Sequence, residues 1–181
     1  KFLENLPRVE ILLHSIHYFD FIRSILGDPN GVKAKTLGFP GKKTSNTRTT
    51  AILDYGSDIR CALTINHNHN FGRKFQACEF RICGTKGAAY VQLGVNLNYP
   101  KGAPDILEIN LGKEWVNIPL IGSWFIESFG NRMSQLQRYI SGEESELIAS
   151  VKDSWNTMAL VEAAYKNSED PGTLIPKYIG R

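Results

Sequence analysis

The residues most suited to chemistry are four histidines, which stand in two close pairs. His14 and His17 are three positions apart, the spacing of neighbours on one side of a helix. His67 and His69 are two apart, the spacing of neighbours on one face of a strand. An imidazole exchanges protons near neutral pH, binds metals and hydrogen-bonds in both directions. For the helical pair a catalytic or binding role and a structural role are both open.

The second histidine pair lies in residues 65–71, a segment that also holds three asparagines. Amide and imidazole groups both donate and accept hydrogen bonds, as the hydroxyl groups of a sugar or polyol require. The segment is therefore a candidate binding site for such a molecule, and the alternative is an ordinary polar loop at the end of a strand.

The two histidine pairs together could form the ligand shell of a zinc ion. We find no cysteine or acidic residue at ligand spacing from them, and the sequence does not require the pairs to meet, so we assign no metal ligand. The segment Gly38–Thr44 departs from the phosphate-loop pattern, because its glycines are too close together. We therefore expect no cofactor to be bound by this chain alone.

The helical pair must be positioned by a helix that we predict from Glu10 to Leu26. Gly27 and Pro29 follow and end it. Its apolar residues recur at the 3.6-residue period of a buried face: Leu12, Ile16, Phe19, Ile22 and Leu26. The opposite face carries His14, His17 and Phe21, where charged residues are more usual, so we expect it to meet a ligand, another domain or a sheet.

The middle of the chain has the composition of strands and turns. We predict strands at 32–37, 47–55, 59–67, 76–83, 88–93, 106–111 and 115–119, and helices at 124–140 and 150–167. Short turns such as Tyr55–Asp58 and Gly84–Gly87 favour antiparallel pairing. The order predicts an α+β fold, with an open, mostly antiparallel β-sheet and helices packed on one face. Some strands are apolar on both faces, which favours a homo-oligomer through the other face of the sheet.

Composition limits the remaining possibilities. A chain of 181 residues with 42% hydrophobic and 22% charged residues is typical of one globular domain. The net charge of +3 is small and scattered, so we expect no nucleic-acid partner. No apolar run is long enough to span a membrane. Three cysteines without a CxxC pair suit a reducing compartment, so we expect a cytoplasmic protein. The chain starts without methionine, and we expect a fragment of a longer protein.

Three segments carry a resemblance to a known family. The stretch from His17 to Pro29 reads H-x-x-D-x-x-R-x-x-x-G-x-P, and it resembles the opening of the C-terminal domain of the glucose–fructose oxidoreductase / inositol dehydrogenase (Gfo/Idh/MocA) family. Residues Cys78–Gly87 resemble the family's strand that ends in G-T-x-G. The segment from Ser150 to Tyr165 resembles its closing helix. The three motifs occur in the family's order.

The resemblance implies a function as well as a fold. Residues 1–181 would be the C-terminal substrate-binding and oligomerisation domain, without the N-terminal Rossmann domain that binds NAD or NADP. Family members pass hydride between a sugar or polyol carbon and the nicotinamide. The residue matching His17 acts as general acid or base on the hydroxyl, and a partner lysine belongs to the absent domain. Further pocket residues are expected to be Glu10, His14, Tyr18, His67, His69 and Asn70.

One position departs from the family. Many members carry Asp four residues before the catalytic histidine, where this chain has Leu13. Either another group orients His17, or the domain has lost the reaction and serves as a non-catalytic dimerising or sugar-binding module. Asp20 is expected to be structural.

Overall fold

The computed structural model of the chain describes residues 2–68, 71–95 and 102–176. The chain divides into two compact units, each with its own sheet. The first is made by Lys1–His69 and Ala149–Arg181, and the second by Asn70–Ile148. The candidate residues of the helix and of the third strand all fall in the first unit.

The sheet of the first unit has the strand order β1-β2-β3 and is antiparallel throughout. Strand β1 is Gly31–Leu37, β2 is Arg48–Asp54 and β3 is Arg60–Asn66. Ala34 pairs with Ala51, and Leu53 pairs with Cys61. The β2–β3 connection turns at Gly56, whose φ of 84° few residues other than glycine adopt. Short connections of this kind make antiparallel neighbours of consecutive strands.

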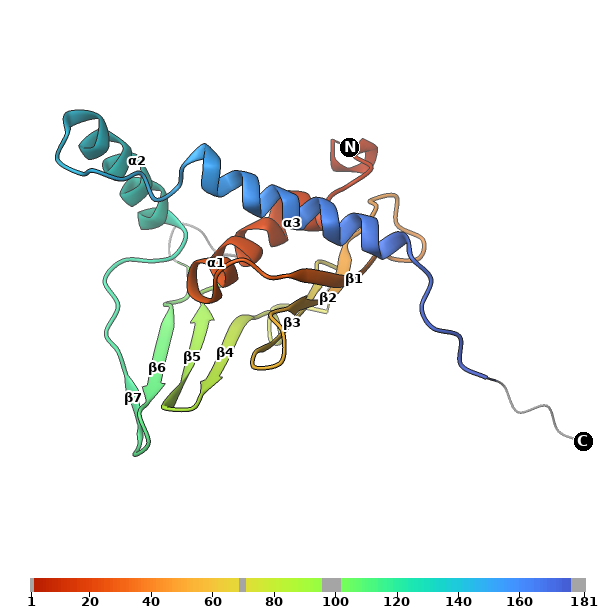
Figure 1. Cartoon of the computed structure of the whole chain (residues 1–181), viewed down its shortest axis with the longest axis horizontal. Helices are drawn as coiled ribbons and strands as arrows, with labels where there is room; N and C mark the ends of the chain where they lie inside the picture. Colours follow the sequence, from red (N-terminus) through yellow and green to blue (C-terminus); the bar gives the residue numbers. More distant parts are fainter. Residues whose placement is uncertain (1, 69–70, 96–101, 177–181) are drawn as a thin grey trace, which may run out of the picture. The chain divides into compact units, whose positions relative to one another are not determined.

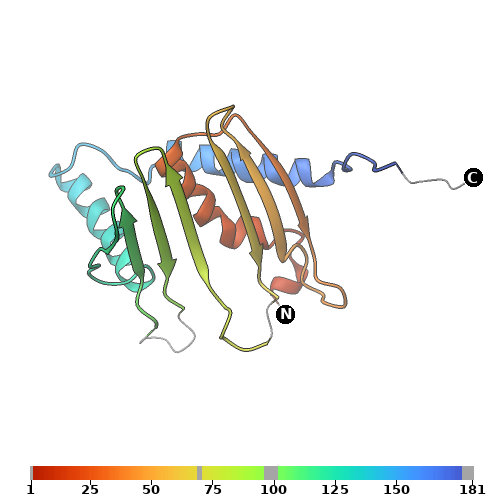
Figure 2. The ribbon, with the colours of Figure 1, turned by 90° about the horizontal axis from the view of Figure 1, so that it is seen from below.

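Two helices cover one face of this sheet, as Figures 1 and 2 show. Helix α1 is Ile16–Leu26, and α3 is Val151–Glu169. Both bury apolar side chains against inward-facing residues of the strands, so the alternation of the strands and the helical period meet in one core. The buried members of that core are Ile11, Phe19, Ala34, Ala51, Leu53, Leu160, Val161, Ala164 and Tyr165.

Strand β1 lies at the edge of its sheet, and α3 satisfies part of that edge. The Ala34 N–H donates to the side-chain oxygen of Asn167 at 2.7 Å, and the Thr36 N–H donates to the Ser168 hydroxyl at 2.9 Å. An edge strand that keeps its N–H groups open can pair with another chain. The polar end of α3 therefore fastens helix to sheet and blocks that pairing.

The second unit has a four-stranded antiparallel sheet of order β4-β5-β6-β7. Its strands are Cys78–Gly84, Gly87–Leu93, Ile106–Asn110 and Trp115–Asn117, and helix α2 is Ile126–Ser141. Trp124 fixes the start of α2, because its indole N–H donates to the Gly94 carbonyl at 2.7 Å. The apolar stripe of α2 is largely exposed, at 66% for Phe129 and 75% for Ile140.

The predicted α+β class, with open antiparallel sheets, is confirmed. Each predicted strand and each predicted helix has a counterpart within a few residues. The described strands divide between two sheets, a division that the strand pattern did not predict. The three cysteines, all in the described part of the chain, form no disulfide. Among the described residues, none of the helices combines the length and apolar character needed to cross a bilayer.

Candidate functional site

The segment that carries the first histidine pair is a helix in two parts. Residues Ile11–Ser15 form a π-helical turn, and α1 continues from Ile16. The Ile16 N–H donates to the carbonyl of Ile11, five residues back. π-Helical turns are rare in proteins, and those that occur often lie at functional sites, where the wider turn redirects the side chains on it. The predicted helix is confirmed in its extent, but its first turn is wider than the 3.6-residue period implies.

Contacts from distant segments hold the π-helical turn in place. The Leu12 N–H donates to the hydroxyl of Tyr165 on α3 at 3.3 Å. The Glu10 N–H donates to the Asn46 carbonyl at 3.1 Å. Tyr165 is buried, and its own position is supported by Arg8, whose guanidinium lies 4.5 Å from the ring centre. The start of the helix is therefore tied both to α3 and to the loop before β2.

Glu10 is fully buried, at 0% exposure. One carboxylate oxygen, Oε1, accepts a hydrogen bond from the Ser15 hydroxyl. Within the described part of the chain, the other oxygen, Oε2, has no hydrogen-bond partner. Burial raises the pKa of Glu10, while the nearby Ser15 and Thr49 hydroxyls and the charge of His14 oppose that shift. A buried carboxylate with an unsatisfied oxygen is costly, and such groups are commonest where function requires them.

His14 and His67 lie beside this carboxylate. Nε2 of His67 is 3.7 Å from Oε1 of Glu10. The two imidazole rings are 4.2 Å apart between centres and nearly perpendicular, at 86°. Both rings keep exposed surface, and their partial desolvation lowers the pKa of both histidines; for His14 the charge of the neighbouring His67 lowers it further. The His67 N–H donates to the Thr47 carbonyl at 3.0 Å, which fixes the chain at the end of β3.

The remaining predicted site residues are placed less closely together. His17 lies on the first turn of α1 with its side chain exposed. Tyr18 is half-buried, and its ring lies 5.7 Å from that of His14. His69 and Asn70 lie outside the described residues. The structure therefore brings together Glu10, His14 and His67 as one cluster, with Tyr18 against its edge and His17 on the neighbouring turn.

One expectation from the sequence is wrong, namely that no acidic residue stands at ligand spacing from the histidines. Glu10 stands four residues before His14, and a ligand atom of each of Glu10, His14 and His67 lies within 4.8 Å of the others. The spacing was visible in the sequence, but glutamate at the start of a helix is usually a solvated residue, so its burial was the missing information.

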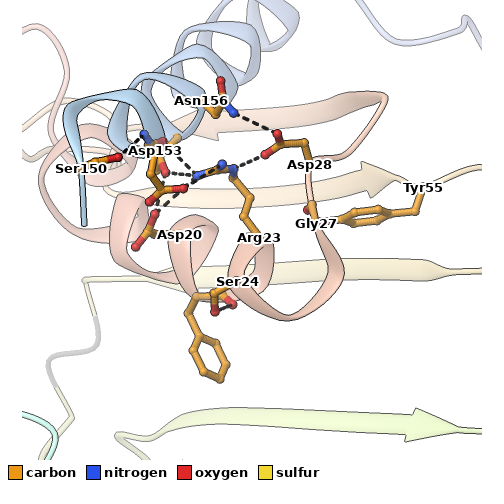
Figure 3. Close-up of polar contacts among 11 residues, drawn as sticks. Asp20, Arg23, Ser24, Gly27, Asp28, Tyr55, Ser150, Asp153 and Asn156 are labelled. Carbon is orange, nitrogen blue, oxygen red and sulfur yellow. Dashed lines mark hydrogen bonds and ion pairs between the residues drawn. The ribbon is translucent and has the colours of Figure 1, made fainter. Parts of the chain in front are cut away.

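Arg23, the arginine of the H-x-x-D-x-x-R motif, supports the helix that carries His17. Its side chain is 7% exposed and joins α1 to the first turns of α3 (Figure 3). Nε donates to Asp28 at 2.6 Å, Nη2 donates to Asp153 at 3.3 Å, and Nη1 donates to the hydroxyl of Thr157. That hydroxyl in turn donates to Asp20 at 2.6 Å, which supports the structural role expected for Asp20. The network holds the helix that presents His17.

A shallow depression of about 250 Å³ lies elsewhere on this unit. It is bounded by Asp28, Pro29, Asn156, Ala159 and Leu160. None of the predicted site residues lines it, so the candidate site is defined by the cluster of ionisable side chains and not by this depression.

Comparison with known proteins gives one family. Residues 10–90 match the GFO/IDH/MocA C-terminal domain. This match includes the helix, the cluster around Glu10 and the strand that ends in Gly84-Thr85-Lys86-Gly87. The resemblance predicted from the motifs is therefore confirmed. No curated protein matches the sequence significantly.

Several solved structures share the fold. An oxidoreductase from Agrobacterium radiobacter, in complex with NAD+, L-tartaric acid and magnesium, has 24% identity and a TM-score of 0.72, with 92% of this chain and 49% of that chain covered. An oxidoreductase from Desulfitobacterium hafniense, named as NADPH-dependent, has 15% identity and a TM-score of 0.66, with 86% and 44% covered. An aldose–aldose oxidoreductase from Caulobacter crescentus, complexed with glycerol, has 14% identity and a TM-score of 0.66, with 93% and 48% covered. The chain spans about half the length of these structures.

Proposed function

We propose that this chain is the C-terminal, substrate-binding and oligomerisation domain of an NAD(P)-dependent oxidoreductase that acts on a hydroxyl of a sugar or polyol. The observation that carries the proposal is the exposed imidazole of His17 in a segment that matches the GFO/IDH/MocA C-terminal domain. Support comes from the fold shared with oxidoreductases and from the fact that the chain covers about half of their length. We infer that a Rossmann domain elsewhere in the longer protein completes the enzyme, in the cytoplasm.

The proposed reaction requires one proton and one hydride to leave the substrate. His17 takes the proton of the hydroxyl group through a neutral ring nitrogen. NAD or NADP, when bound by the other domain, receives the hydride from the same carbon, which becomes a carbonyl carbon. An exposed imidazole suits this step, because it reaches a substrate at the surface and passes the proton on to water. In the reverse direction the protonated imidazole returns the proton to the forming hydroxyl.

Recognition of the substrate is assigned to the polar groups around His17. We propose that Tyr18, His14 and His67 hydrogen-bond its hydroxyl groups, since each can donate or accept. The buried Glu10 is proposed to orient these side chains. His69 and Asn70, which lie outside the described residues, are proposed to add hydrogen bonds to the substrate. Two of the solved structures that share the fold contain glycerol and L-tartaric acid, small polyhydroxylated molecules of the kind proposed.

The oligomer is proposed to form through the sheet. The face of β2 opposite the helices carries Ile52, which is 53% exposed. A contiguous apolar patch on a sheet face favours pairing with a second copy, and Ile52 would be one member of such a patch. Analytical ultracentrifugation tests this part of the proposal, and a strict monomer at high protein concentration would contradict it.

Activity is tested in the longer protein that carries both domains. With NAD+ or NADP+ and a panel of sugars and polyols, His17→Ala should lower turnover by about 10²- to 10⁴-fold, the usual contribution of a general acid or base. Ser24→Ala is the control, since Ser24 lies exposed near the end of the same helix and its hydroxyl donates to the Phe21 carbonyl one turn back. A His17→Ala enzyme that retains the turnover of the control would remove His17 from the mechanism.

A second candidate is a non-catalytic dimerising or sugar-binding module of the same fold. It is favoured by Leu13, which stands where many family members carry Asp and is 45% exposed. A longer protein that binds a polyol and does not reduce NAD(P)+ with any member of the panel would favour this candidate over the enzyme.

A further inference from the structure

The cluster around Glu10 has the composition of a metal site. It joins one carboxylate and two imidazoles, from residues 10, 14 and 67. In zinc sites that keep a position open for a water or a substrate, three protein ligands of this kind are usual, and two histidines with one glutamate is a known set. The three ligand atoms lie within 4.8 Å of one another in the structure.

The state of the Glu10 carboxylate points to a cation. The side chain is 0% exposed, and within the described residues Oε2 has no hydrogen-bond partner. Ser15 donates to Oε1, and the nearby Thr49 hydroxyl donates to the Thr36 hydroxyl, so neither occupies Oε2. A buried carboxylate is stabilised by hydrogen bonds or by a positive charge, and a carboxylate with one open oxygen is suited to coordinate an ion. A purely structural glutamate would be expected to have both oxygens satisfied.

The distances leave room for an ion between the three groups and show no direct hydrogen bond between His67 and Glu10. Nε2 of His67 is 3.7 Å from Oε1 of Glu10, which is too long for a hydrogen bond. Bonds of about 2.0–2.2 Å to zinc place neighbouring ligand atoms in a tetrahedral site about 3.3–3.6 Å apart. His14 and His67 are both exposed, so small rotations of the two rings close the difference.

The local structure preorganises these three groups. Glu10 directly precedes the π-helical turn and His14 lies within it, four positions on, and ligand atoms of the two side chains lie within 4.8 Å of each other. The loop 46–47 binds the backbone on both sides of the cluster, since Asn46 accepts from the Glu10 N–H and Thr47 accepts from the His67 N–H. The helix and the end of β3 are therefore held together at the point where the ligands meet.

We propose that Glu10, His14 and His67 bind one divalent transition-metal ion of the zinc class, with the fourth position open to water or to a ligand hydroxyl. Imidazole ligands favour zinc and its neighbours over magnesium or calcium, which prefer oxygen ligands only. The proposal concerns metal binding by this chain and does not depend on the oxidoreductase activity.

The test is titration of the chelator-treated chain with Zn2+ by calorimetry, and with Co2+ by visible absorption, without nucleotide or substrate. We expect one saturable site and a higher melting temperature in the presence of Zn2+, because binding to the folded state alone stabilises it. His14→Ala and His67→Ala should each weaken binding by about 100-fold or more, since even groups that merely support a ligand contribute about 10- to 100-fold. Both residues are exposed, so these variants should fold.

His17→Ala is the matched control, because it removes an exposed histidine from the next turn of the same helix, and its affinity should stay within about twofold of the wild-type value. Glu10→Gln removes the charge and keeps the size of the buried side chain, and it should weaken binding as the histidine variants do. The proposal is overturned if no saturable site is found, if His14→Ala and His67→Ala bind like the control, or if His17→Ala loses binding equally. Metal binding is measured without nucleotide or substrate, and the role of His17 is measured separately as turnover of His17→Ala, so the two proposals fail separately.

Discussion

Replacement of Arg23 by methionine should weaken the attachment of the helix that presents His17 to α3. Methionine keeps most of the apolar stem and removes the guanidinium, which is 7% exposed and bonded to Asp28, Asp153 and Thr157. The carboxylates that remain are about half exposed, so water can solvate them again. Thr157 keeps Asp20 as an acceptor and is not left unsatisfied.

The expected loss of unfolding free energy can be estimated from these contacts. The 2.6 Å charge-assisted bond to Asp28 should contribute about 1–2 kcal/mol, since the Asp28 carboxylate is 55% exposed and partly screened by water. The 3.3 Å contact with Asp153 should add about 0–1 kcal/mol, because that carboxylate is 42% exposed. We expect Arg23→Met to lower the free energy of unfolding by about 1–3 kcal/mol, less than the roughly 3–5 kcal/mol lost when one partner of a fully buried pair is removed.

Urea unfolding followed by far-ultraviolet circular dichroism measures this difference. Arg60→Met is the control, since it makes the same chemical change at an exposed position of β3 in the same unit, and surface changes usually stay within about 0.5 kcal/mol. If Arg23→Met costs no more than this control, the network does not hold α1 to α3, and the account of how His17 is positioned is wrong.

Three further predictions concern single positions. Ser150→Ala removes the acceptor for the Asp153 N–H at the start of α3, so the melting temperature should fall as stability drops by about 0.5–2 kcal/mol, and an unchanged melting temperature would contradict the cap. Gly27→Ala should lower the free energy of urea unfolding by about 1–3 kcal/mol, because φ is 78° there although a Cβ would meet no other atom. Gly130→Ala, within α2, should leave that free energy unchanged or raise it, and a change of the same sign in both variants would refute the backbone argument. Burial raises the pKa of the Cys61 thiol, whereas Cys83 is exposed. Iodoacetamide at neutral pH should therefore modify Cys83 before Cys61, as followed by mass spectrometry, and faster modification of Cys61 would count against the structure.

The sequence predicted the elements well because their signals are local. Alternation marked β2, and the helical period marked the core face of α1, where Phe19 is fully buried. Gly27 ended the helix as predicted, with a positive φ. Such signals depend on a few neighbouring residues, and nothing in the tertiary structure opposed them.

The site was only partly predictable, because its key features depend on contacts between distant segments. The two histidines of the cluster are separated by 53 positions, and their approach depends on the loop 46–47 that binds both Glu10 and His67. Ser15 lies at the end of the π-helical turn and bonds to Glu10, five residues before it, and no periodicity of the sequence indicates this turn. The burial of Glu10 could not be read from its residue type, since glutamate is usually exposed.

The role of His17 is tested most directly by the pH dependence of hydride transfer in the longer protein, measured in single turnovers with NAD(P)+ and an active polyol. If His17 takes the hydroxyl proton, the wild-type rate rises with pH as one group loses its proton, and His17→Ala lowers the rate and abolishes that rise. A His17→Ala enzyme that is slower but keeps the same rise would show that another group takes the proton, and would contradict the assignment of His17.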